Sequence, residues 1–99
     1  MKKLLLPFAL LVLLSACENN DISTGRKIYE KYLQKTLKDP ESLVIHEEKV
    51  ELLKSPEVKF TVDYGAKNGF GAMNRSTMVF ETHGSFDYLT VNGKFTKIE

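Results

Sequence analysis

The sequence has one cysteine, two histidines and no tryptophan among its 99 residues. A single cysteine excludes an internal disulfide, so the fold has to be held by packing and hydrogen bonds. The histidines, His46 and His83, are far apart in the chain, and no spacing of His, Asp and Glu side chains matches a zinc-ligand pattern. We therefore predict no catalytic residues, no metal site and no cofactor.

An excess of charge of one sign is also missing, since 14 Lys and Arg residues nearly balance 13 Asp and Glu residues. This balance gives no electrostatic reason to expect a nucleic-acid partner. Charged residues make up 27% of the chain and hydrophobic residues 42%, which is typical of a folded domain. The length allows one domain.

The one long apolar run lies at the N-terminus. Lys2 and Lys3 precede it, residues 4–14 form it, and Ser15-Ala16-Cys17 follow it. A positive start, an apolar stretch of about 7–15 residues and a small-residue cleavage site are typical of an export signal. The run is too short for a membrane span, which needs about 20 residues. We expect residues 1–16 to be a cleaved signal peptide.

Leu14-Ser15-Ala16-Cys17 resembles the lipobox of bacterial lipoproteins. The resemblance implies that Cys17 is lipidated, with palmitate-like chains that anchor the protein in a lipid bilayer. Because residue 18 is Glu rather than Asp, it also implies the inner leaflet of the outer membrane, facing the periplasm, if the host is Gram-negative. Residues 17–21 would then be the lipidated cysteine and its tether, and residues 22–99 one small domain.

Residues 22–38 carry the pattern of one amphipathic helix. Ser23 or Thr24 is the predicted N-cap, Gly25 is a small propensity cost, and Asp39-Pro40-Glu41-Ser42 ends the helix or opens one further turn. The core-facing stripe consists of Ile28, Tyr29, Tyr32, Leu33, Thr36 and Leu37. The opposite face carries Lys27, Lys31, Lys35 and Lys38, and we interpret it as solvated rather than membrane-bound.

The remaining residues predict antiparallel strands. Residues 57–64 alternate cleanly between apolar and polar side chains. Residues 43–53 alternate less well around His46-Glu47-Glu48, which predicts a bulge. Further strands are expected over 76–82, 86–91 and 95–98, the last two joined by a two-residue hairpin at Asn92-Gly93. The predicted fold is α+β, one N-terminal amphipathic helix packed on a four- to five-stranded antiparallel sheet, a meander.

The register of the central hairpin follows from the requirement that apolar residues share the buried face. Pairing Val58 with Phe80 and Phe60 with Met78 satisfies it. Residues 67–71 then form the turn, with two glycines suited to positive backbone angles.

Two short elements resemble those of a set of small uncharacterised exported bacterial proteins. Asp39-Pro40-Glu41-Ser42 matches an Asp-Pro-x-Ser element after a helix, and Ala66-Lys67-Asn68-Gly69-Phe70-Gly71 matches an Ala-Lys-Asn-x-x-Gly element after a strand. The resemblance implies a fold and an exported setting, but no activity.

The candidate binding residues lie in and beside the glycine-bounded loop: Lys67, Asn68, Phe70 and Arg75. Loops on rigid scaffolds often carry binding residues, and an aromatic beside a cation suits an interface. The alternative is that Phe70 folds back onto the sheet edge and Lys67 is merely solvated.

We therefore expect a non-enzymatic binding module in the cell envelope. It would contact the bilayer through acylated Cys17 and would bind an envelope protein or the cell wall, but not nucleic acid. One alternative is a lipoprotein that excludes phage or plasmids or inhibits a hydrolase. The other is an envelope hydrolase.

Overall fold

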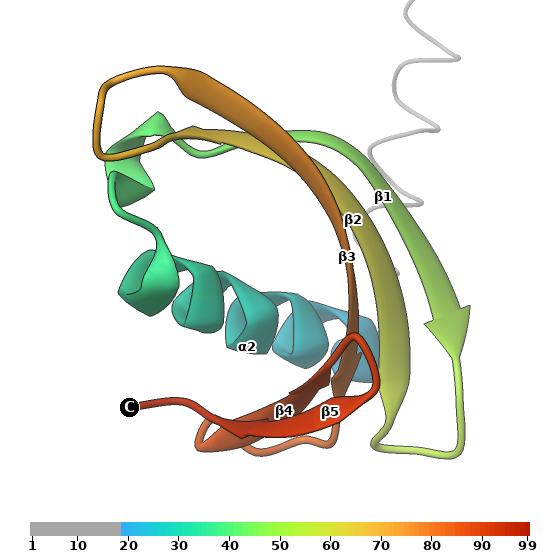
Figure 1. The fold of residues 1–99 in the computed structure, drawn as a ribbon. Helices are drawn as coiled ribbons and strands as arrows, with labels where there is room; N and C mark the ends of the chain where they lie inside the picture. Colours follow the sequence, from blue (N-terminus) through green and yellow to red (C-terminus); the bar gives the residue numbers. More distant parts are fainter. Residues whose placement is uncertain (1–18) are drawn as a thin grey trace, which may run out of the picture.

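The computed structural model describes residues 19–99, so the expected signal peptide, Cys17 and residue 18 lie outside the described residues. In chain order, with the labels of Figure 1, the elements are α2 (Asn20–Thr36), the 3-10 turn η1 (Pro40–Ser42), β1 (Val44–Leu52), β2 (Val58–Lys67), β3 (Met73–Thr82), β4 (Tyr88–Val91) and β5 (Lys94–Lys97). No helix among residues 19–99 is long and apolar enough to cross a membrane.

The five strands form one antiparallel sheet in the order β1-β2-β3-β4-β5. The sheet is curved, and α2 lies on its concave side (Figure 1). The predicted α+β fold, one helix on a four- to five-stranded antiparallel meander, is therefore confirmed, with five strands. Every other residue of β2 points at the helix and is buried, which is the pattern of a sheet with one covered face.

The concave side holds the hydrophobic core. Ile28, Tyr29 and Leu33 of α2 are at most 1% exposed, and so are Phe60 and Phe80 of the sheet. The Tyr29 ring stacks on Phe80 with centroids 5.1 Å apart and meets Phe60 at a tilt, 5.0 Å away. Complete burial of three large rings is the main stabilising feature of so small a core.

The helix begins two residues earlier than predicted, and its N-cap is neither Ser23 nor Thr24. The Asn19 side chain accepts a hydrogen bond from the Asp21 backbone N–H at 2.6 Å. Asn is as good an N-cap as Ser, and the polar residues before Ile22 hid this start from the apolar pattern. The helix also ends earlier, at Thr36, and Pro40 opens the short turn η1 as expected.

Gly25 is the point of closest approach between α2 and the sheet. A Cβ atom built there would lie 2.5 Å from Thr82 Oγ1 and 2.7 Å from a Phe60 ring carbon. A larger side chain would push the helix off the sheet. Glycine lowers the intrinsic stability of the helix, as expected from the sequence, but the close packing leaves no room for any other residue here.

An ion pair ties α2 to the edge strand β1. Arg26 donates from Nη2 to Glu48 Oε1 at 2.7 Å and from Nε to Oε2 at 3.0 Å. The Tyr29 hydroxyl donates to Glu48 Oε2 as well. Burial raises the pKa of Glu48, but these hydrogen bonds lower it more, and the net shift is downward. Burial and the same contact with Glu48 raise the pKa of Tyr29.

The predicted register of the central hairpin is wrong by two residues. Phe60 pairs with Phe80 rather than with Met78, and Val58 pairs with Thr82 rather than with Phe80. A shift of two residues keeps every side chain on its face, so alternation cannot distinguish the two registers. The observed pairing sets Phe60 and Phe80, the two largest fully buried residues of the sheet, side by side in the core and moves the loop to residues 68–72.

The local features of the sheet match the sequence more closely. The register of β1 shifts between Ile45 and Glu47, which confirms the predicted bulge. Val91 pairs with Lys94 around Asn92 and Gly93, both with positive φ, which confirms the two-residue hairpin. β4 begins at Tyr88, two residues later than predicted.

Candidate functional site

The loop between β2 and β3 is held in shape by one side chain. Asn68 Oδ1 accepts from the backbone N–H of Phe70 at 2.8 Å and of Ala72 at 3.1 Å. The Asn68 backbone N–H donates to the Ala72 carbonyl at 2.9 Å. Gly71 has a φ of 83°, a conformation that glycine adopts without strain. The loop is therefore internally bonded.

Phe70 projects from the tip of this loop, and 97% of it is exposed. The alternative in which the ring folds back onto the sheet edge is excluded. A fully solvated aromatic on an ordered loop contributes nothing to the core, and large aromatics are enriched in binding interfaces.

The structure divides the four residues that the sequence singled out. Asn68 and Phe70 share the loop, whereas Arg75 lies on the opposite, convex face of the sheet, paired with Gly65. There Arg75 donates to both oxygens of Asp63, at 2.9 and 2.8 Å. Hydrogen bonds from Arg75 lower the pKa of Asp63. Arg75 does not join the loop site.

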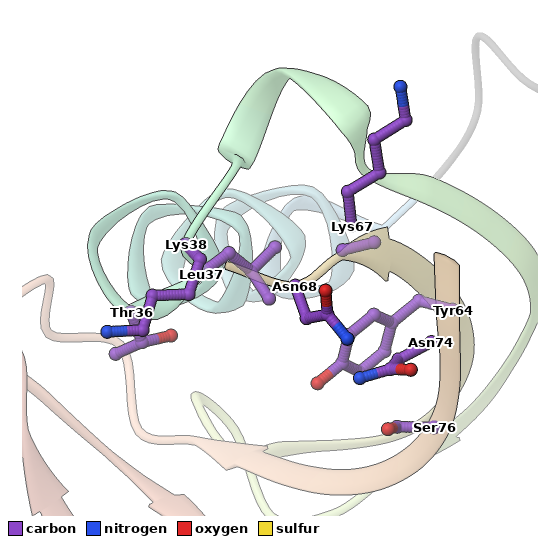
Figure 2. Close-up of a pocket in the computed structure, with 9 residues that line it drawn as sticks. Thr36, Leu37, Lys38, Tyr64, Lys67, Asn68, Asn74 and Ser76 are labelled. Atoms are coloured by element: carbon purple, nitrogen blue, oxygen red, sulfur yellow. The ribbon is translucent and has the colours of Figure 1, made fainter. Parts of the chain in front are cut away.

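Beside the loop, on the concave side, lies a pocket of about 210 Å³. Its lining comes from the C-terminal end of α2, from the residues just after it and from the loop end of the β2–β3 hairpin. The lining residues are Thr36, Leu37, Lys38, Tyr64, Ala66, Lys67, Asn68, Asn74 and Ser76 (Figure 2). The Lys67 side chain extends away from Tyr64, Asn74 and Ser76 in Figure 2. Its backbone N–H donates to Ser42 Oγ at 2.7 Å, which ties η1 to the hairpin.

The pocket exists because the helix is shorter than the strands beneath it. α2 ends at Thr36, while β2 and β3 continue to the loop. Asn74 and Ser76 are paired with Ala66 and Tyr64, so they occupy the same concave face as the buried Phe60 and Val62. Polar residues at strand positions that face the concave side are a signal in the sequence from which this pocket could have been predicted. They mark where the helix no longer covers the sheet.

Tyr64 lines the pocket and is 5% exposed. Burial, and then the neighbouring Tyr32 hydroxyl, raises the pKa of Tyr64. Its hydroxyl is therefore protonated at neutral pH, when it is both a hydrogen-bond donor and an acceptor.

No family model matches this chain, and no curated protein or solved structure matches it either. The functional assignment therefore depends on the residues of this chain alone.

The two histidines lie outside the pocket. His46 is exposed at the bulge of β1. His83 is half-buried, 2.8 Å from Thr90 Oγ1 and 3.3 Å from Glu57 Oε2. His46 acts electrostatically on Asp63 but is exposed rather than buried beside it in a cleft, and such a buried pair is what would have favoured the envelope hydrolase. Within residues 19–99, no three His, Cys, Asp or Glu side chains gather as metal ligands.

Proposed function

We propose that the protein is a membrane-anchored lipoprotein whose domain binds another component of the cell envelope without catalysing a reaction. The anchor is lipidated Cys17, and the binding end is the β2–β3 loop with its adjacent pocket. The observation that carries the proposal is the 97% exposure of Phe70 on a loop fixed by Asn68. A preorganised loop loses little conformational entropy when it binds.

The start of α2, which the proposed anchor precedes in the sequence, and the proposed binding loop lie at opposite ends of β2. The Ser55 hydroxyl donates to Asp21 Oδ2 at 2.7 Å, so the start of α2 lies at the turn between β1 and β2. The loop lies at the other end of β2, which spans ten residues or about 30 Å. Cys17 precedes the cap residue Asn19 by only two positions, or at most about 7 Å of chain. This supports a module that presents its loop away from the bilayer.

Photo-crosslinking from position 70 in intact cells tests the binding role. We expect a crosslinked product when the photoreactive residue replaces Phe70, and none when it replaces the exposed Lys54 at the other end of β2. With the photoreactive residue moved to position 69, Phe70→Ala should abolish capture, and the melting temperature should be unchanged because the ring is outside the core. A large drop in melting temperature, or no product from position 70, would refute the proposal.

Cell fractionation tests the anchor. Cys17→Ser removes the thiol that acyl chains require, so we expect the variant to keep its leader and to lose incorporation of labelled palmitate. The unchanged chain should partition with membranes and incorporate the label. A parent protein that is unlabelled and freely soluble would contradict the lipoprotein proposal.

One alternative role uses the same exposed residue. A projecting aromatic on a narrow loop also suits insertion into the cleft of an enzyme, as in an inhibitor or exclusion lipoprotein. The crosslinking experiment separates the two roles, because an inhibitor would be captured on an incoming phage, plasmid or hydrolytic protein. A neighbourhood of phage or plasmid genes would favour this alternative, and a housekeeping neighbourhood would count against it.

A further inference from the structure

We propose that the pocket beside the loop binds one uncharged sugar ring of a glycan. The inference deepens the proposed function and rests on it, since it selects wall glycan rather than a protein as the partner. It is argued from the charge, the hydrogen-bonding groups and the size of the pocket.

The charges around the pocket disfavour ions of either sign. None of the nine lining residues is Asp or Glu, so a metal ion or an organic cation would find no carboxylate. An anion would meet the C-terminal end of α2, where free carbonyl groups give the helix dipole its negative end. The positive charge of Lys38 partly cancels this negative end of the helix dipole. The Lys67 side chain extends away from the polar side chains of the pocket, so its ammonium does not face a ligand there (Figure 2). With cations and anions both disfavoured, the pocket suits an uncharged ligand.

The polar groups of the pocket match sugar hydroxyls. Asn68, Asn74, Ser76, Thr36 and the Tyr64 hydroxyl all belong to the lining. Amide and hydroxyl side chains both donate and accept hydrogen bonds, as sugar hydroxyls do. Asn68 Oδ1 is already bonded to the loop, which leaves its amide N–H groups for a ligand.

The apolar part of the lining matches the other face of a sugar ring. The Tyr64 ring, Leu37 and Ala66 supply carbon surface next to the polar groups. A sugar ring presents C–H groups on its faces and hydroxyls around its edge, so it satisfies both kinds of surface together. The volume of about 210 Å³ is below the roughly 300–1,000 Å³ of pockets for drug-sized ligands, and so suits a single ring.

The location of the pocket favours the wall as the source of the sugar. It lies at the loop end of β2, away from the start of α2, which the proposed anchor precedes by a few residues in the sequence. A glycan strand approaching from outside the bilayer reaches this end first. Phe70 at the adjacent tip would then contact the rest of the strand.

The test titrates the full chain, as its host makes it and purified in detergent, with three probes. They are a tetramer of N-acetylglucosamine, a tetramer of glucose and inorganic phosphate. Saturation-transfer NMR reports which ligand protons contact the protein, and calorimetry gives the affinity. We expect at least one neutral oligosaccharide to bind and phosphate not to bind.

Variants locate the site. Asn74→Ala and Tyr64→Phe should each weaken binding about tenfold, the value of one hydrogen bond of about 1.4 kcal/mol. Thr77→Ala is the matched control, because Thr77 is an exposed polar residue of the same strand on the convex face. Ser76→Ala replaces Asn74→Ala if the latter has a lowered melting temperature.

Each outcome decides the inference. Oligosaccharide binding that falls in the pocket variants and persists in Thr77→Ala supports it. Binding that is equal in all variants, or seen only with phosphate, overturns it. If neither oligosaccharide binds while position 70 still captures a protein, the glycan inference fails and the proposed binding function survives. If membrane fractionation fails while sugar binding holds, the anchor proposal alone is wrong.

Discussion

Gly25 shows how one missing side chain sets the distance between the helix and the sheet. Alanine is the better helix former by about 1 kcal/mol, so an isolated helix would gain from Gly25→Ala. In the folded protein the new methyl would overlap Thr82 and Phe60, and overpacking of this kind costs about 1–3 kcal/mol. We expect Gly25→Ala to lower the free energy of unfolding, measured by urea denaturation.

Gly69→Ala is the control for this substitution. A Cβ atom at Gly69 would have no neighbour within 4 Å, and Gly69 is not among the positive-φ residues. We expect this variant to match the parent within experimental error. Equal stability of both alanine variants would show that the helix approaches the sheet less closely than described.

Glu48 links the stability of the domain to pH. Its folded-state pKa is below the ordinary value, so its contribution is complete above about pH 4.3, the pKa of an unperturbed Glu. That contribution is lost as the pH falls from this value through the lower folded-state pKa. Glu48→Gln should cost about 1.5–3 kcal/mol at pH 7, the usual value of hydrogen bonds to a charged group.

Denaturation as a function of pH checks this prediction. The parent should lose stability below about pH 4.3 more steeply than Glu48→Gln. Asp63→Asn is the comparison, because the Asp63–Arg75 pair is on the surface, with the Arg75 side chain 63% exposed. Solvent screens such pairs, so this variant should remain close to the parent at pH 7. Identical pH profiles for the parent and Glu48→Gln would contradict the role given to Glu48.

Among the elements, the β2–β3 loop depends on the Asn68 side chain. Asn68→Ala removes the acceptor of the Phe70 and Ala72 amides. We expect these two amides to exchange with solvent faster, as followed by NMR, while amides in the core strands are unaffected. Capture through Phe70 should weaken in parallel, since the ring would no longer be held in one position. Unchanged exchange at both amides would show that the backbone alone fixes the loop.

The elements also show where sequence reasoning succeeds and where it does not. The Asn92-Gly93 hairpin and the bulge after Ile45 are local, so a few neighbouring residues determine them. The register between β2 and β3 depends on how Phe60 and Phe80 pack in three dimensions. The alternation of apolar and polar residues is the same after a shift of two residues, so it cannot reveal such a shift. Asn19 as N-cap was missed because it lies before the apolar pattern begins.

The candidate site was predicted in part for the same reason. Asn68 and Phe70 are neighbours in the sequence, and their loop was recognised from its glycines. Arg75 was grouped with them because it is close in sequence, although a strand sends alternate side chains to opposite faces. The pocket combines the end of α2 with the β2–β3 hairpin, which only the folded chain brings together.

For the whole molecule, the proposed acylation of Cys17, two positions before the N-cap Asn19 in the sequence, predicts an orientation on the bilayer. A nitroxide label at position 70 should be accessible to water-soluble relaxation agents in reconstituted vesicles. A label at position 54, beside the start of α2, should be close to the lipid headgroups. Electron paramagnetic resonance with water-soluble and lipid-soluble agents measures both. Equal accessibility of the two labels would mean that the domain lies flat or tumbles on the membrane.

Under the proposed acylation of Cys17, the short stretch of sequence between this residue and α2 also limits how far the protein would reach. β2 runs from the turn beside the start of α2 to the loop and spans about 30 Å, and the intervening chain adds at most about 7 Å. A lipoprotein with a long disordered stalk can search a deep layer of the periplasm. Anchored as we propose, this protein would reach only a thin layer above its own leaflet, so its ligand would have to be brought into that layer by growth or diffusion.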